Sequence, residues 1–392
     1  MSRLSRALQT AGAVSLDRAA VSSSPLLPNE PRIADPGRQE VLTTQYLLPN
    51  LTQLNSCLLA IRTLVDAELK QSQPTKMGKS YPLGQCLEIS QAVQKRLRTL
   101  DESMLPLEAQ AGFRALSAFQ QAGGAFRQVW GDLRGKYFQN AFQVGTLYID
   151  VANDTVTPTK PKVEILPFRE AEFGPIQDFS HFCRVARAYW GGEFYPNHVL
   201  PSLAPHCPLI HVIASGRVQL HDASHYMLSL SRAQKFSGSE AVLRAEPMPP
   251  RLFEHVSGLL RDAGYQAPKD AVHGQQLGLQ QCREQRRKRW HLDPRFLQKA
   301  FVDARTVNSH LARRPFLIDQ PSNFVKPVMQ KIRIDNTDYN IDNLSHEARK
   351  QLQNLQFLDQ EIARLQAHLS ALQTARGAYI GALRSALPAQ QA

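Results

Sequence analysis

Apolar residues in the first third of the chain recur at the spacing of a helix. Steps of three and four residues place six of them on one helix face: Leu47, Leu51, Leu54, Leu58, Ile61 and Val65. Two further helices are predicted over about residues 85–100 and 107–121, the second ended by Gly123 and Gly124. The pattern therefore predicts three helices before the first strand.

Aromatic and β-branched residues dominate the next stretch and alternate with a period of two. "NAFQV", the pair Gly145-Thr146 and "LYIDV" predict a β-hairpin over residues 140–151. Residues 160–168 predict a further strand that ends at a proline.

The middle of the chain mixes helix and strand signals. A helix is predicted from Phe179 to the break at Gly191-Gly192. Residues 207–232 predict strands around the turn at Ser215-Gly216, and residues 250–265 predict an amphipathic helix.

The end of the chain carries the clearest pattern. Residues 331–344 alternate around Asn336-Thr337-Asp338 and predict a hairpin, after which Ser345 is predicted to cap a long helix. Its heptad positions are Leu355, Leu358, Ile362, Leu365, Leu369 and Leu372. They predict a coiled coil with a second copy or a protein partner, or a helix packed on its own domain.

Composition narrows the classes of protein. The chain of 392 residues is 43% hydrophobic and has no apolar run long enough to span a membrane. Five cysteines lie far apart without a C-x-x-C pair, so we expect free thiols, a cytoplasmic location and no cofactor. Residues 1–20 fit a disordered tail, the alternative being a transit peptide of similar composition. A net charge of +12 allows nucleic acid, anionic lipid or acidic proteins as partners.

The stretch "YPLGQCLEIS" raises the question of catalysis, because it places Cys86 at the predicted start of a helix. A cysteine nucleophile acts as a thiolate, and a helix N-terminus beside a histidine lowers the pKa of the thiol. The free N–H groups there also stabilise an oxyanion. Cys86 is therefore a candidate nucleophile, the alternative being a buried structural thiol.

Gly84-Gln85-Cys86 and the helix after it resemble the nucleophile helix of the transglutaminase-like and papain-like cysteine enzymes. In that superfamily the catalytic His opens the first strand of a following two-stranded unit, and an Asp or Asn lies on the next strand. The hairpin here is similar in layout, with Asn140 in place of the His and Asp150 in place of the orienting Asp. The resemblance covers residues 84–154 and implies a catalytic set of Cys86, Asn140 and Asp150.

The chain departs from that family at the general base. The expected position holds Asn140, or Gln139 if the register shifts by one, and neither amide accepts a proton near neutral pH. No histidine precedes His181. The domain is therefore either a degenerate relative that kept the fold and lost the reaction, or an enzyme that borrows His211 or His221.

Two further sets of residues are candidate sites. The weak metal candidates are His206, His211, His221 and His225, but the glutamate of an H-E-x-x-H motif is absent and we expect no metal. The candidate anion or nucleic-acid site is the basic run Arg283, Arg286, Arg287, Lys288, Arg289 and Trp290. On a helix, one face would carry phosphate-binding groups and a stacking ring, formed by Arg283, Arg286 and Arg287 together with Trp290. The alternatives are an acidic partner, a membrane surface and a solvated helix face.

Residues 332–387 resemble a small bacterial module of unknown function that recurs at protein C-termini. This resemblance implies a bacterial protein and assembly rather than catalysis. Together the patterns predict an α+β protein in five parts. These are a disordered arm (1–40), a cysteine-protease-like domain (41–170) with the papain/transglutaminase-like core, a mixed α/β region (171–260), a basic helical connector (261–330), and a β-hairpin and coiled-coil association module (331–392).

Three hypotheses about function follow. The first is a non-catalytic protein-binding or scaffold protein on a degenerate cysteine-enzyme fold. The second is a cysteine-dependent hydrolase or acyl transferase that uses Cys86. The third is a nucleic-acid-associated factor that uses the basic run.

Overall fold

The computed structural model describes residues 25–76, 79–213, 215–220, 224–316, 331–334 and 337–340, together with Ser345 and Ala348. The chain divides into two compact units, Met1–Ile318 and Asp319–Ala392. Helices and strands both occur, so the described residues form an α+β protein, as the sequence predicts. None of the described helices combines the length and the apolar character needed to cross a membrane.

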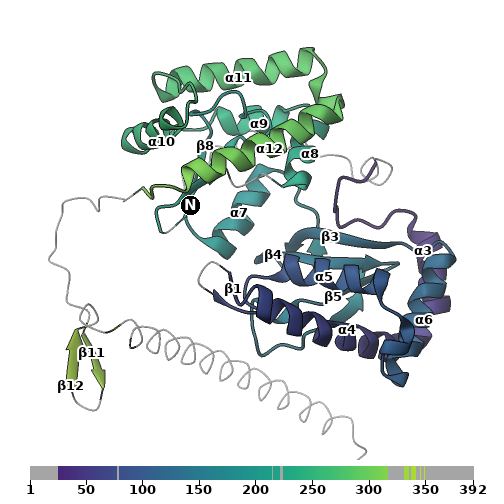
Figure 1. The fold of residues 1–392 in the computed structure, drawn as a ribbon. Helices are drawn as coiled ribbons and strands as arrows, with labels where there is room; N and C mark the ends of the chain where they lie inside the picture. Colours follow the sequence, from purple (N-terminus) through teal and green to yellow (C-terminus); the bar gives the residue numbers. More distant parts are fainter. Residues whose placement is uncertain are drawn as a thin grey trace, which may run out of the picture. The chain divides into compact units, whose positions relative to one another are not determined.

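The first half of the larger unit packs helices on one face of an antiparallel sheet (Figure 1). Its helices are α3 (Pro36–Leu42), α4 (Leu51–Ser72), α5 (Cys86–Thr99) and α6 (Leu107–Gln121). Its strands are β3 (Phe126–Leu133), β4 (Tyr137–Val144), β5 (Leu147–Asp150), β6 (Glu164–Pro167) and β7 (Phe173–Gly174), in the spatial order β6-β5-β4-β3-β7. Short elements complete it: a π-helical turn (Thr43–Leu47), 3-10 turns (Leu48–Asn50, Glu102–Met104, Asn153–Thr155, Phe168–Glu170), and the hairpin of β1 (Thr75–Lys76) and β2 (Lys79–Ser80).

The core of this half lies between α4, α5, α6 and one face of the sheet. Large side chains such as Ile61, Phe119 and Phe142 are fully buried there. The helices α4 and α6 approach closely at Gly112, where a Cβ atom would lie 2.1 Å from the Gln53 carbonyl oxygen. The three predicted helices are confirmed, because their periodic apolar residues form this buried layer.

Residues 25–42 run along the edge of this half. The Trp130 N–H donates to the Asn29 carbonyl at 2.8 Å, and the Arg127 guanidinium donates to the Glu30 carbonyl at 3.1 Å. Pro36 opens α3, a position where its missing N–H costs no hydrogen bond. The predicted disordered arm is therefore wrong for residues 36–40, where proline starts a helix instead of preventing one.

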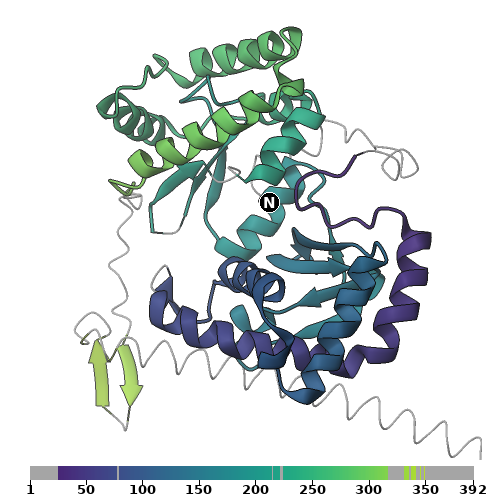
Figure 2. The same cartoon turned by 45° about the vertical axis from the view of Figure 1, so that its right-hand side comes forward.

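The second half of the larger unit surrounds a small antiparallel sheet with helices (Figure 2). The sheet consists of β8 (Glu193–Pro196), β9 (Leu209–Val212) and β10 (Val218–Leu220), in the order β10-β9-β8. The helices are α7 (Phe179–Trp190), α8 (His225–Ala233), α9 (Ser237–Leu243), α10 (Pro250–Asp262), α11 (Ala271–Arg287) and α12 (Pro294–Leu311), with a 3-10 turn η6 (Trp290–Leu292). Ala304, Val307 and Leu311 of α12 are buried against the same core as β9 and β10, so α12 packs within this half.

The segment from His225 to Arg232 is helical, although the sequence predicts strands there. Ser224 caps α8 by accepting a hydrogen bond from the Met227 N–H at 3.2 Å. Leu228 packs into one core and Leu230 into another, so α8 is buried on several sides. Its polar residues His225, Ser229 and Arg232 follow a helical spacing, but the alternation of Leu and Ser over residues 228–231 also fits a strand and misled the prediction.

In the second unit, the predicted hairpin is confirmed as β11 (Lys331–Ile334) paired with β12 (Thr337–Asn340). Ile334 pairs with Thr337, so Thr337 begins the second strand and does not belong to the turn. The Ser345 hydroxyl accepts a hydrogen bond from the Ala348 N–H at 3.1 Å, as expected of a helix cap. The heptad residues from Leu355 to Leu372 lie outside the described residues.

Candidate functional site at Cys86

Cys86 is the first residue of α5, so the prediction that it opens a helix is confirmed. Gly84 makes the turn before it with a φ of 72°, a conformation that glycine adopts without strain. The Gly84 N–H donates to the Thr155 carbonyl at 2.9 Å. This bond ties the start of the helix to the loop after β5.

A buried arginine braces that loop. Arg62 of α4 is fully buried and donates to the Val151 carbonyl at 2.6 Å and to the Asp154 carboxylate at 2.9 and 3.0 Å. Its Nε also donates to Asp66 at 2.6 Å. This cluster was not predicted from the sequence, although Arg62 and Asp66 are four residues apart beside the apolar face of α4.

The Cys86 thiol lies against Asn140 of β4. The Asn140 Nδ2 donates to Sγ at 3.5 Å, and the Ser90 hydroxyl joins the same helix to the Asn140 carbonyl at 3.1 Å. Cys86 is 8% exposed. Burial raises the pKa of the Cys86 thiol, while hydrogen bonds from Asn140 oppose that rise. The thiol is therefore held in its protonated form.

Aromatic residues of α7 and β4 lie beside this pair. Burial raises the pKa of the Tyr189 phenol, and the nearby Cys86 raises it further. The Tyr189 ring is 6.1 Å from Tyr137 and 6.4 Å from Phe138, edge-on in both cases. Tyr189 therefore belongs to the aromatic group that packs α7 on β4.

Asp150 has a separate set of partners. Its carboxylate accepts hydrogen bonds from the Gln139 Nε2 at 2.7 Å, the Tyr148 hydroxyl at 3.2 Å and the Ala152 N–H at 2.7 Å. The side chain is fully buried, and this burial raises its pKa to about 6, although the three donors lower it. Asp150 is thus a buried carboxyl group whose side-chain partner on β4 is the Gln139 amide.

The sheet separates Asn140 from Asp150. Phe142 pairs with Ile149, and both belong to the core under the helices. Since side chains alternate along a strand, Asn140 shares the helix-covered face and Asp150 takes the opposite one with Gln139. The three residues of the predicted catalytic set therefore form two pairs, Cys86 with Asn140 and Gln139 with Asp150, on opposite faces.

The described histidines are held elsewhere. Within the described residues, the Cys86 thiol accepts its side-chain hydrogen bond from Asn140, and the charges of Asp150 and Lys76 also act on its pKa. The His211 Nε2 lies 2.8 Å from the Gly191 carbonyl oxygen, and its ring stacks on Phe194. His221, the other candidate base, lies outside the described residues.

The weak metal candidates are dispersed in the structure. His206 contacts the Phe236 ring, and burial lowers its pKa to about 4. His225 stacks on Phe301 at 4.0 Å. In the part of the chain that the structure describes, no group of three or more His, Cys, Asp or Glu side chains could hold a metal ion.

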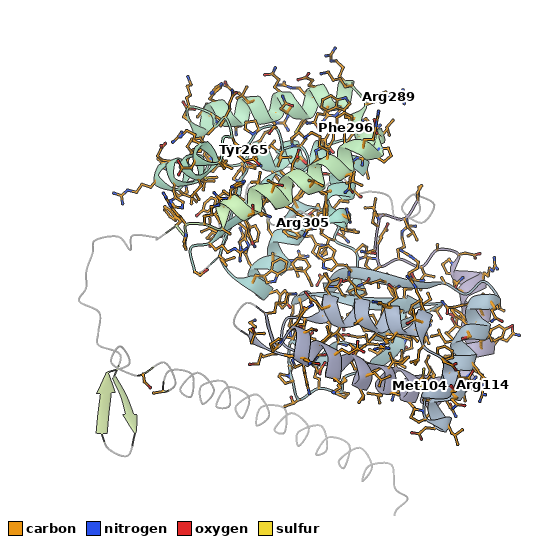
Figure 3. The ribbon with its side chains drawn as sticks, viewed as in Figure 1. Met104, Arg114, Tyr265, Arg289, Phe296 and Arg305 are labelled. Carbon is orange, nitrogen blue, oxygen red and sulfur yellow. The ribbon has the colours of Figure 1, made fainter. Side chains whose placement is uncertain are left out.

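The basic run spans a helix end and a turn. The sequence predicted that Trp290 shares a helix face with the arginines. This is wrong, because α11 ends at Arg287 and Trp290 lies in η6. The Trp290 ring stacks on Phe296 at 4.1 Å, and the Lys288 ammonium lies 5.0 Å from its centroid. Figure 3 shows Arg289 and Phe296 at the end where α11 meets α12. Trp290 is thus covered by its own chain, which disfavours base stacking.

The cations of the run differ in their partners. Arg286 donates to the Lys235 carbonyl at 2.8 Å and pairs with Glu240 at 2.7 Å, and Lys288 pairs with Glu284. A second group is exposed and has no ion pair within the described residues: Arg283, Arg287 and Arg289. The run therefore offers these three to an external anion.

Comparisons with known proteins supply no relative, since no protein-family model, no curated protein and no solved structure matches this chain. The resemblance to the transglutaminase-like enzymes therefore stays a prediction from short motifs. The contacts of Cys86, Asn140 and Asp150 are what a functional proposal can rest on.

Proposed function

We propose that this is a non-catalytic bacterial binding or scaffold protein built on a degenerate papain/transglutaminase-like fold. The observation that carries the proposal is the hydrogen bond from the Asn140 amide to the Cys86 sulfur at 3.5 Å. A catalytic imidazole would occupy this place and take the thiol proton. An amide nitrogen donates there and cannot accept that proton.

Two further contacts support a structural role for the thiol. Burial raises the pKa of Cys86, which is the opposite of what a nucleophile requires. The Asp150 carboxylate bonds to Gln139 on the other face of the sheet, so it does not orient a group beside Cys86. The Cys86–Asn140 pair then serves to dock α5 on β4.

Binding is the function left to such a protein, and the heptad residues from Leu355 to Leu372 are our candidates for it. A seam of this length favours a second copy of the chain or a helix of a protein partner. Cytoplasmic location belongs to the same proposal, because five thiols without a disulfide fit a reducing compartment.

Alkylation of the native protein tests the proposal. Iodoacetamide labelling mapped by mass spectrometry should modify Cys86 at least roughly tenfold more slowly than an unstructured thiol near neutral pH. Cys57 is a matched internal control, because it is fully buried and burial raises its pKa to about 12. Labelling of Cys86 well ahead of Cys57 and of a free thiol would restore the cysteine-hydrolase alternative.

Nucleic-acid binding stays as a second proposal because Arg283, Arg287 and Arg289 are exposed without an ion pair in the described residues. A gel shift on random single-stranded DNA and RNA at low salt should show binding that weakens steeply with added salt. Replacing the three arginines together by Gln should abolish it. No shift by the wild-type protein at low salt would remove this proposal.

A further inference from the structure

A pocket of about 280 Å³ opens between three segments of the larger unit. One wall is the stretch before α3, with Leu27 and Pro28, and another is the last turn of α8 and the residues after it. The third is η6, directly after the basic run. Volumes near 300 Å³ are the lower end of small-molecule sites, so the pocket suits a small ligand.

The polar side chains of the pocket are donors. Ser229 and Arg232 lie three residues apart on α8, so they share a face, and Lys235 and His291 complete the polar lining. Arg232 uses its Nε to donate to the His291 carbonyl at 3.0 Å. Its terminal nitrogens and the Lys235 ammonium have no hydrogen-bond or ion-pair partner among the described residues. Two unpaired cations therefore border one small cavity.

The acidic side chains near the pocket are already engaged. Glu30, which accepts from the Leu27 N–H at 2.7 Å, pairs with Arg32 at 2.7 Å. The Asp293 carboxylate raises the pKa of Arg232 through its negative charge. It accepts hydrogen bonds from Arg295 at 2.6 and 3.0 Å. Glu240 pairs with Arg286. The excess charge at the pocket is thus positive, and none of these acids forms an ion pair with Arg232 or Lys235 in the described structure.

The pKa of His291 is affected by the same positive charges. Desolvation lowers its pKa, and Lys235, Arg232, Arg289 and Arg286 lower it further. Its Nδ1 is buried without a partner in the described part of the chain. The neutral His291 therefore adds no charge to those of Arg232 and Lys235.

We propose that this pocket binds a small phosphomonoester, with the phosphate on Arg232 and Lys235 and the organic group against Leu27, Pro28 and Leu292. Guanidinium and ammonium groups are the strongest side-chain partners of phosphate, and Ser229 adds a hydroxyl donor. The apolar wall distinguishes an organic phosphate from the inorganic ion. The site is independent of Cys86.

Isothermal titration of the full chain with phenyl phosphate, inorganic phosphate and phenol tests the proposal. Phenyl phosphate should bind more tightly than inorganic phosphate, and phenol should not saturate the protein. The affinity for phenyl phosphate should fall as salt rises, because the contact is ionic. Lys235→Gln should weaken it by about tenfold, the loss expected for one charge-assisted hydrogen bond.

The control is Arg287→Gln, which removes an exposed charge of the neighbouring helix outside the pocket. It should leave the affinity unchanged. Arg232→Gln should weaken binding at least as much as Lys235→Gln; since Arg232 is 9% exposed and this variant can misfold, Lys235→Gln carries the test by itself. No saturable binding of phenyl phosphate at low salt, or equal losses in Lys235→Gln and Arg287→Gln, would overturn the site. Equal affinities for inorganic and phenyl phosphate would contradict the proposed contact between the organic group and the apolar wall.

Discussion

Cys86 shows two opposing effects on one thiol. A helix N-terminus stabilises a nearby anion by about 0.3–1 kcal/mol. Removing an ion from water costs several kcal/mol, even after the protein relaxes around it. Because Cys86 is 8% exposed, burial outweighs the helix and its pKa rises. A position at a helix start makes a thiolate only where water or a charged partner reaches the sulfur.

Asp150 predicts a pH dependence of stability. Its pKa rises from 3.8 to about 6 on folding, so the folded state holds a proton that the unfolded state has lost between these values. The contribution of protonated Asp150 to the free energy of unfolding is therefore fully present below pH 3.8, and it is lost as pH rises through about 6. The loss is about 3 kcal/mol. Asp150→Asn cannot titrate and should not show it.

Urea unfolding at a series of pH values from about 4 to 7 measures this difference. The free energy of unfolding of the wild type should fall by about 3 kcal/mol relative to Asp150→Asn across this range. Asp262→Asn is the control, because Asp262 is 68% exposed and should track the wild type. A wild-type-minus-Asp150→Asn difference that is constant with pH would show that Asp150 keeps an ordinary pKa.

Local signals in the sequence were enough to place Cys86 at a helix start and Asn140 on the next hairpin. The separation of Asp150 from Asn140 depends on register, which the Gly145-Thr146 turn already sets. Continued along the strands, the Phe142–Ile149 pairing puts Asp150 on the face opposite Asn140. The comparison with the cysteine enzymes matched residue types along the chain and did not consider which face of the sheet each side chain occupies. It therefore did not predict that Asn140 and Asp150 are separated.

At the scale of elements, the packing of α4 on α6 depends on a single small residue. A Cβ at Gly112 would lie 2.1 Å from the Gln53 carbonyl oxygen, which a rigid helix backbone cannot avoid. Gly112→Ala should therefore lower the free energy of unfolding by about 1–3 kcal/mol. Chemical denaturation measures this loss.

Gly258 in α10 is a matched control for this substitution. No atom lies within 4 Å of its Cβ position, so Gly258→Ala should gain stability by about 0.5–1 kcal/mol through helix propensity. Opposite signs for the two variants identify the helix contact as the cause. A neutral or stabilising Gly112→Ala would contradict the packing of α4 on α6.

The elements that the sequence predicted well have one polar and one apolar face. α5, α6 and α10 keep polar residues toward solvent, so their period is visible. α8 is short and its Leu and Ser residues alternate, so the sequence alone also fitted a strand. The pocket beside it was equally invisible, because Leu27, Arg232 and His291 come from distant parts of the chain.

At the scale of the whole molecule, charge is concentrated in one region. Residues 175–316 hold 19 Lys and Arg against 11 Asp and Glu, a formal charge of +8 out of the +12 of the chain. The two cations of the pocket, Arg232 and Lys235, and the exposed arginines of the basic run lie in this region. Long-range attraction should therefore steer anionic ligands toward it.

The division into two units predicts the effect of a truncation. Deletion of residues 345–392 removes the heptads and leaves Met1–Ile318 intact. If the heptads self-associate, as we propose, light scattering should give a lower mass for the truncated chain, while its thermal unfolding transition should persist. An unchanged mass would contradict self-association and leave a hetero-partner or a packed helix.

The central claim is that Cys86 is a protonated structural thiol bonded to Asn140. The most direct test is the thiolate absorbance of the wild type minus that of Cys86→Ala, followed as a function of pH. We predict no absorbance step below pH 9.0, the ordinary value from which burial raises the pKa of this thiol. A step between about pH 4 and 8 would mean an activated thiolate and would contradict the claim.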